Sequence, residues 1–253
     1  MPYSASRPIH ESPSLEAYLL GLIDFERALG LARRLVFDAG GGNDRQIRLL
    51  LCEHPTTVTV GRQGSRAHLR VDERELESRQ IPVRWVNRGG GCLVHAPGQL
   101  AVYPIVPLET FGWSVGEYMA RLQGAWQSML NELGIAARPH AGRHGLWGRT
   151  GQLVAMGVAV NGWITYHGSF LNVDPSMTLQ QLVDSDPAEH TPLTSLVVER
   201  QQPIKMPLVR SRLIGHLAAA FEVERQHLYS GHPYLSPGTT PRGATSPPRR
   251  RVG

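Results

Sequence analysis

The spacing of hydrophobic positions predicts one long helix near the start of the chain. Residues 14–37, SLEAYLLGLIDFERALGLARRLVF, repeat apolar side chains at the three- and four-residue intervals of a helix. Ser14 is the expected N-cap, and the following DAGGGND contains the glycines that would end such a helix.

The rest of the pattern alternates irregularly between strands and helices. Runs of apolar and β-branched residues bounded by Gly or Pro predict strands within 46–54, 56–61, 81–88, 100–108 and 146–173. The last stretch divides into two or three strands, with glycine turns at 151 and 161–162. Helices are predicted over 72–80, 114–134 and 208–224, the second of them ending on Gly134.

These elements favour a single α+β domain, a mixed β-sheet flanked by helices, because no regular βαβ alternation is present. No internal repeat or linker interrupts residues 14–229. Residues 1–13 are predicted to be a flexible leader. Residues 230–253, rich in Pro, Gly, Ser and Arg, are predicted to be a disordered basic tail.

Composition narrows the class of protein. The 253 residues are 41% hydrophobic, which is enough for a full core, yet no apolar run reaches the roughly 20 residues that span a bilayer. The N-terminal residues carry no secretory signal, so a cytoplasmic location without membrane insertion is expected. The net charge of +5 resides largely in the tail, which argues against nucleic-acid binding. Two cysteines provide neither a disulfide framework nor a zinc pattern, and no metal is expected.

The stretch WVNRGGGCLVHAPGQL, residues 85–100, combines three consecutive glycines with polar side chains. Glycines allow backbone N–H groups to approach a ligand, and Arg88 at the entrance is suited to a carboxylate or a phosphate. The spacing matches neither a Walker loop nor a dinucleotide fingerprint. A tight turn between two strands explains the same glycines without any ligand.

Three histidines follow apolar runs and lie next to Gly or Pro or one residue from Pro: His54, His95 and His167. Because strand ends often present side chains to one site, these histidines are candidates for a convergent acid/base or positioning site. Cys52 and Cys92 lie inside apolar runs, where a cysteine is most simply a small buried hydrophobe with an inert thiol.

Taken in order, the segments LLLCEHPTTVTVGRQG, VNRGGGCLVHAPGQLAVYPIVPL, GLWGRTGQLVAMGVAVNGWITYHGSFLNVD and PLTSL resemble the lipoyl(octanoyl) transferases, within the biotin/lipoate protein ligase-like superfamily. The resemblance covers roughly residues 15–200. Its specific signatures are Arg-Gly-Gly followed by His-x-Pro-Gly-Gln-Leu, and His-Gly-x-x-Leu-Asn-Val.

The resemblance implies transfer of an octanoyl chain from acyl carrier protein to a lysine of a lipoyl domain, in 2-oxoacid dehydrogenases or the glycine cleavage protein. It implies no cofactor. It also implies an acyl pocket made by three segments, namely Arg88, Gly89, Gly90, Gly91, Cys92, Leu93, Val94 and His95, then Ala155, Met156 and Gly157, then Gly168, Ser169 and Phe170.

The sequence departs from the family at both catalytic positions. The family lysine corresponds to Gln152, and counting without a gap places the family cysteine at Asp186. Gln152 cannot lower a neighbouring pKa by charge, and an acyl anhydride on Asp186 is far less practical than a thioester. Cys92 is an alternative nucleophile, but strand alternation would direct it away from His95, its nearest base.

Three hypotheses remain. The first is an octanoyltransferase with altered catalytic residues, supported by the matching pocket residues. The second is a non-catalytic module that binds an acyl chain, a lipoyl domain or a carrier protein, supported by the loss of both catalytic groups. The third, a ligase that activates lipoate or biotin with ATP, is disfavoured because such relatives need the missing lysine.

Overall fold

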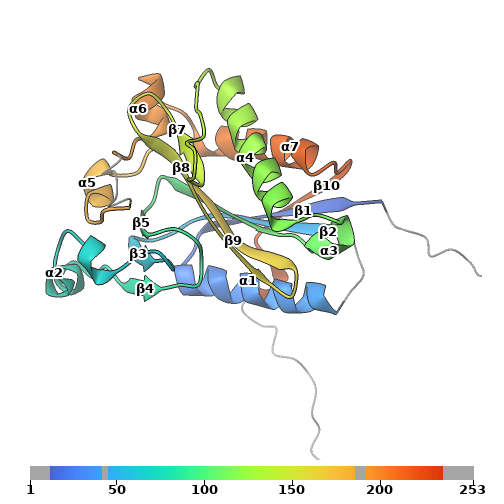
Figure 1. The fold of residues 1–253 in the computed structure, drawn as a ribbon, viewed down its shortest axis with the longest axis horizontal. Coiled ribbons are helices and arrows are strands. Elements are labelled where there is room, and N and C mark those ends of the chain that lie inside the picture. Colours follow the sequence, from blue (N-terminus) through green and yellow to red (C-terminus); the bar gives the residue numbers. More distant parts are fainter. Residues whose placement is uncertain (1–11, 42–44, 186–191, 236–253) are drawn as a thin grey trace, which may run out of the picture.

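The computed structural model describes residues 12–41, 45–185 and 192–235, which form two β-sheets covered by helices (Figure 1). The main sheet has seven strands in the order β10-β1-β2-β6-β9-β8-β7, and the smaller sheet has the order β4-β3-β5. The main strands are β1 (Ser14–Leu22), β2 (Gln46–Glu53), β6 (Gln99–Ile105), β7 (Gly145–Trp147), β8 (Gln152–Asn161), β9 (Ile164–Asn172) and β10 (Arg225–Ser230). The small sheet contains β3 (Thr57–Val60), β4 (Val83–Trp85) and β5 (Cys92–His95).

The main sheet is mixed, as the sequence predicts. β1 runs parallel to both β2 and β10, whereas β6, β9, β8 and β7 are joined by antiparallel pairing. The predicted α+β class with a mixed sheet and flanking helices is therefore confirmed.

Helices cover both faces of the main sheet, and alternate residues of β2 show how. Leu49 and Leu51 pack with α4 (Val115–Glu132) and α7 (Met206–Ala220). Leu50 and Cys52 point to the other face and pack with α1 (Phe25–Gly40). Figure 1 shows α4 and α7 on one side of the sheet and α1 on the opposite side.

The small sheet has a core of its own. Val58, Val60, Cys92 and Val94 pack against Leu76 of α2 (Glu73–Ser78) and against the segment that follows α5 (Met177–Gln180). The remaining short helices are α3 (Leu108–Phe111), α6 (Leu196–Arg200), and the 3-10 turns Arg66–His68 and Pro233–Leu235.

Most predicted elements agree with the structure, including the helices over 72–80 and 114–134 and the strands between 46 and 173. The two glycine turns at 151 and 161–162 also separate β7, β8 and β9. Within the described ranges, no helix has the length and hydropathy needed to cross a bilayer.

The single helix predicted over 14–37 is wrong in its first half. Ser14–Leu22 is strand β1, and the helix begins after Asp24, whose side chain accepts a hydrogen bond from the Arg27 N–H at 3.0 Å. β1 has strands on both sides, so its backbone groups are paired along the sheet. Leu15 and Ala17 are buried in the sheet, which explains an apolar run that resembles a helix pattern.

The predicted boundary of a disordered tail at residue 230 falls inside an ordered element. The last long helix ends at Ala220, not at 224, and β10 includes Ser230. The Tyr229 ring stacks on Tyr18 of β1 with centroids 5.1 Å apart, and the His232 ring lies tilted against Tyr18 with centroids 4.5 Å apart. The described part of the chain continues to Leu235, and residues 236–253 lie outside it.

Candidate active site

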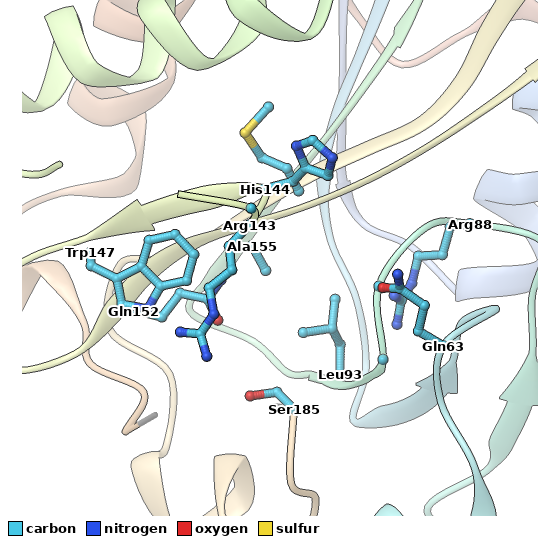
Figure 2. Close-up of a pocket in the computed structure, with 13 residues that line it drawn as sticks. Gln63, Arg88, Leu93, Arg143, His144, Trp147, Gln152, Ala155 and Ser185 are labelled. Atoms are coloured by element: carbon cyan, nitrogen blue, oxygen red, sulfur yellow. The ribbon is translucent and has the colours of Figure 1, made fainter. Parts of the chain in front are cut away.

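A cavity of about 280 Å³ lies between the glycine loop before β5 and the β7–β8 hairpin (Figure 2). Figure 2 shows Trp147, Gln152 and Arg143 on one side of it, Gln63 and Arg88 on the other, and Leu93 between them. The full lining is Gln63, Arg88, Gly90, Gly91, Leu93, Gly142, Arg143, His144, Trp147, Gln152, Ala155, Met156 and Ser185.

Part of the expected acyl pocket meets at this cavity. Arg88, Gly90, Gly91, Leu93, Ala155 and Met156 line it, together with Gln152. Other expected residues do not line it, namely Gly89, Cys92, Val94, His95, Gly157, Gly168, Ser169 and Phe170. The assignment of substrate-binding roles to the whole set stays a prediction.

The glycine loop is fixed by backbone hydrogen bonds to residues 61–63 on one side and to the Val158 carbonyl on the other. The N–H groups of Gly61, Arg62 and Gln63 donate to the carbonyls of Gly91, Arg88 and Gly90. Gly90 has a φ of +81°, and a Cβ on Gly61 would lie 2.4 Å from its carbonyl oxygen. The loop needs glycines chiefly because two backbone segments touch there.

Arg88 is buried, and its side chain links the glycine loop to β3 through hydrogen bonds. Its guanidinium donates to the carbonyl oxygens of Gly89 (2.9 Å) and Thr59 (3.1 Å) and to the Thr59 hydroxyl (2.7 Å). Burial lowers the pKa of Arg88 to about 10, so the group remains charged at neutral pH. Because Arg88 lines the cavity, it contributes a positive charge to the cavity wall.

Two of the three predicted histidines, His54 and His95, lie close together, but none of the three lines the cavity. The rings of His54 and His95 lie 5.7 Å apart, and both are buried. His54 bonds to the Ile23 carbonyl and the Tyr103 hydroxyl, and His95 to Thr59 and Gln99. Burial lowers the pKa of His54 to about 4 and that of His95 well below its usual range. Both rings are neutral and fully hydrogen-bonded, and this arrangement suits positioning better than proton transfer.

His167 belongs to the same region but differs in its contacts. It adopts a positive φ of 55°, is buried, and neither ring nitrogen has a hydrogen-bond partner in the described chain. Burial, reinforced by the charges of Arg88, Arg33 and Arg62, lowers its pKa to about 3. His167 is thus a neutral, buried side chain whose protonation is opposed by the positive charges of Arg88, Arg33 and Arg62.

A buried chain of hydrogen bonds connects the family signatures to Gln152. His95 bonds to the Gln99 side chain at 2.9 Å, and Gln99 donates to Asn172 at 2.9 Å. Asn172 donates to the carbonyl of Thr194 at 3.1 Å, and the Thr194 N–H donates to the carbonyl of Gln152 at 3.0 Å. The polar residues of the two motifs therefore hold the backbone of Gln152, which lines the cavity.

Of the two predicted catalytic positions, the structure describes Gln152 but not Asp186. Gln152 lines the cavity, and its N–H donates to the Pro192 carbonyl at 2.9 Å. Asp186 lies outside the described residues, so its role stays a prediction. Its neighbour Ser185 lines the same cavity as Gln152. The backbone carbonyl of Ser185 lies against the glycine loop, because a Cβ on Gly91 would be 2.9 Å from that oxygen.

Cys92 is directed away from the cavity. It packs in the core of the small sheet, and its thiol donates to the Ser65 carbonyl at 3.7 Å. Burial raises the pKa of this thiol. Leu93, the next residue in β5, faces the cavity instead, as strand alternation requires.

Six lining residues were not anticipated from the sequence: Gln63, Gly142, Arg143, His144, Trp147 and Ser185. Four of them belong to the stretch HAGRHGLW before and within β7, where the His140 ring stacks on Trp147 at 4.6 Å. The density of His, Arg and Trp in that stretch was the available signal. Among the described residues, no group of three or more His, Cys, Asp or Glu could hold a metal ion.

Residues 24–218 match the model of the lipoyl protein ligase A/B catalytic domain, and the chain belongs to this family. It is 35% identical over 214 residues to an octanoyltransferase of Roseiflexus sp., covering 83% of this chain and 89% of that protein. It is 36% identical over 213 residues to an octanoyltransferase of Chloroflexus aggregans, covering 83% of this chain and 96% of that protein.

Solved structures agree in fold at low sequence identity. A bipartite lipoate protein ligase from Thermoplasma acidophilum superposes with a TM-score of 0.69 at 15% identity, covering 88% of this chain and 89% of that one. A lipoate-protein ligase A bound with ATP gives 0.70 at 15% identity, with coverages of 88% and 90%.

Proposed function

We propose that this protein transfers an octanoyl group from acyl carrier protein to a lysine of a lipoyl domain, a step of lipoate biosynthesis. The proposal rests on one observation. In a chain about one third identical to octanoyltransferases, the Arg88 loop, the Ala155–Met156 wall and Gln152 converge on one cavity. The lipoyl domains of 2-oxoacid dehydrogenases and of the glycine cleavage protein are the proposed acceptors.

The cavity supplies the two features that acyl transfer needs. Leu93, Ala155 and Met156 give it an apolar wall for the acyl chain. The buried, charged guanidinium of Arg88 stabilises the negative charge that develops on the carbonyl oxygen during attack.

In this proposal the acyl group moves directly between the two substrates. The neutral amine of the acceptor lysine attacks the thioester carbonyl, a C–N bond forms and the C–S bond breaks. The carrier thiol leaves, taking up the proton that the amine loses. This route is favoured because both cysteines, Cys52 and Cys92, are buried outside the cavity, and burial raises the pKa of both thiols.

A second candidate is a binding module that holds the acyl carrier or the lipoyl domain without turnover. It is favoured by the uncharged Gln152, which lines the cavity and which the resemblance aligns with the lysine of the family. A cytoplasmic location accompanies either candidate, supported by two cysteines that are both free thiols.

One assay separates the candidates. The protein is incubated with octanoyl-acyl carrier protein and an apo lipoyl domain, and the mass of the domain is followed against a reaction without the protein. Octanoylation of the domain supports the transferase. Saturable binding of either partner with no mass gain supports the binding module.

Three variants then test the route. Cys92→Ala and Ser185→Ala should both retain transfer, since direct transfer needs neither side chain as a nucleophile. An octanoyl adduct on the native protein that is lost in Asp186→Ala would contradict direct transfer and favour an anhydride. Free octanoate with ATP should give no product, because the chain lacks the lysine of the ligases.

A further inference from the structure

A second cavity, of about 440 Å³, lies beside the first, and Ser185 lines both. Its lining comes from α5 and from the chain on either side of residues 186–191, and includes Thr150, Gln180, Ser185, Leu193, Thr194 and Val198. The two cavities therefore meet at one residue, next to the position expected for the chemistry.

Gln180 gives this second cavity an unsatisfied polar group. The side chain is only 3% exposed, and its Nε2 has no hydrogen-bond partner in the described chain. A buried amide donor without a partner costs free energy, so such a group is expected to find an acceptor in a ligand. Because Gln180 lines the cavity, that acceptor would enter through it.

The remaining walls include hydroxyl and aliphatic groups, together with the ion pair of Arg70 and Asp184. The hydroxyls of Thr150 and Thr194 lie 2.7 Å apart, while Leu193 and Val198 provide apolar surface. The segment of Leu193 and Thr194 is also hydrogen-bonded to a residue of the first cavity, because the Thr194 N–H donates to the Gln152 carbonyl at 3.0 Å. A ligand in the second cavity would thus be held by the backbone that positions Gln152.

We propose that the second cavity receives the pantetheine arm of the acyl carrier, with the thioester at Ser185 and the acyl chain in the first cavity. This inference rests on the proposed function. A pantetheine arm alternates amides with alkyl groups, and its amide carbonyls are acceptors for Gln180 Nε2. The side chain of an acceptor lysine is an alkyl chain without an amide, and it would leave Gln180 unsatisfied.

The test uses a stable probe, S-octylpantetheine, in which a thioether replaces the thioester. Octanamide, which carries only the acyl part, is the comparison ligand, and both affinities are measured by calorimetry. Gln180→Leu removes the amide at similar volume, and Gln180→Met serves as a second variant. Gln202→Leu, at an exposed position before α7, is the matched control.

Wild-type protein should bind S-octylpantetheine more tightly than octanamide. Loss of one buried hydrogen bond in Gln180→Leu should weaken binding of S-octylpantetheine by about five- to tenfold. Binding of octanamide should not change, and Gln202→Leu should alter neither affinity.

Unchanged binding of S-octylpantetheine by both Gln180 variants would overturn the inference. Displacement of the probe from wild type by a lipoyl-domain peptide containing the acceptor lysine, but not by pantetheine, would also overturn it. If octanamide binds and S-octylpantetheine binds no more tightly, the proposed pantetheine site is contradicted, whereas the acyl pocket in the first cavity is supported. If neither ligand binds, the proposed function fails together with the pantetheine site.

Discussion

The side-chain amide of Gln99 donates to the Asn172 oxygen at 2.9 Å, joining β6 to β9 beneath the candidate active site. The bond belongs to a buried chain from His95 to Thr194, and three of its members, His95, Gln99 and Asn172, lie in the two family signatures. Because the chain ends on the backbone of Gln152, its loss should affect both stability and the cavity.

Asn172→Ala should lower the free energy of unfolding by about 1–3 kcal/mol, because Gln99 and the Thr194 carbonyl would lose their buried partner. Urea unfolding followed by tryptophan fluorescence measures this change. Asn161→Ala, at an exposed position in β8, is the matched control and should change stability little. Equal stability of the two variants would contradict a structural role for the chain of hydrogen bonds.

Gly157→Ala should disrupt the glycine loop, because the added Cβ would lie 2.6 Å from the carbonyl oxygen of Gly89. Displacement of that loop moves Arg88, so we expect loss of octanamide binding together with a lower melting temperature. The control is Gly124→Ala in α4, where a Cβ would meet no atom within 4 Å. Alanine there should be neutral or stabilise the helix by about 1 kcal/mol. Normal ligand binding by Gly157→Ala would argue against the loop as a cavity wall.

The buried histidines should make the protein less stable in acid. Burial lowers the pKa of His54 to about 4 and of His167 to about 3, against about 6.5 in an unfolded chain. Below about pH 6.5 the unfolded state therefore binds protons that the folded state does not. Stability should fall as the pH decreases from about 6.5 to 4, by about 1.4 kcal/mol per pH unit for each histidine.

Urea titrations across this pH range measure the slope. His167→Asn should reduce it by about one proton, since this residue contributes to the slope over the whole interval. A stability that is flat between pH 6.5 and 4 would mean that the histidines are charged in the folded protein.

Restoring the family residues should change the chemical route. In the double variant Gln152→Lys and Asp186→Cys, a thiol and an ammonium return to the positions that the resemblance identifies as catalytic. We expect faster transfer and a hydroxylamine-sensitive octanoyl adduct, detected by mass spectrometry of the intact protein. The same adduct must be absent from Gln152→Lys alone. If the double variant Ser185→Cys and Gln152→Lys forms the adduct and the variant with Asp186→Cys does not, the family cysteine aligns with Ser185 and not with Asp186.

The sequence was sufficient to predict much of the fold because several elements have strong local signals. The helix around Trp126 has a clear apolar stripe, and the β8–β9 hairpin is bounded by glycines. β1 was mistaken for helix because a strand paired on both sides reads as a continuous apolar run, and the residues of 15–23 also happen to match helical spacing. No local pattern indicates that β10 pairs with β1, since that contact depends on the whole chain.

The sequence predicted those residues of the candidate site that lie in recognisable motifs, but not the residues that lie outside them. The resemblance led to Arg88, Gln152, Ala155 and Met156, all of which line the cavity. The resemblance did not distinguish residues that line the cavity from residues that hold the lining in place. His95 was expected in the lining, but it is buried and hydrogen-bonded to Thr59 and Gln99. The sequence does not indicate that Ser185 lines the cavity. That position depends on how closely the segment of Ser185 packs against the glycine loop, and spacing along the chain does not determine such a tertiary contact.

The parallel pairing of β1 with β10 has a consequence for synthesis of the protein. Ser14 lies opposite Arg225, so the outer border of β1 has no partner strand until β10 has been synthesised. Contacts between such distant residues form slowly, and an unpaired strand border is prone to associate with other chains. The nascent protein therefore exposes one border of β1 until β10 is available, and shielding of that border by a chaperone should raise the yield of folded protein.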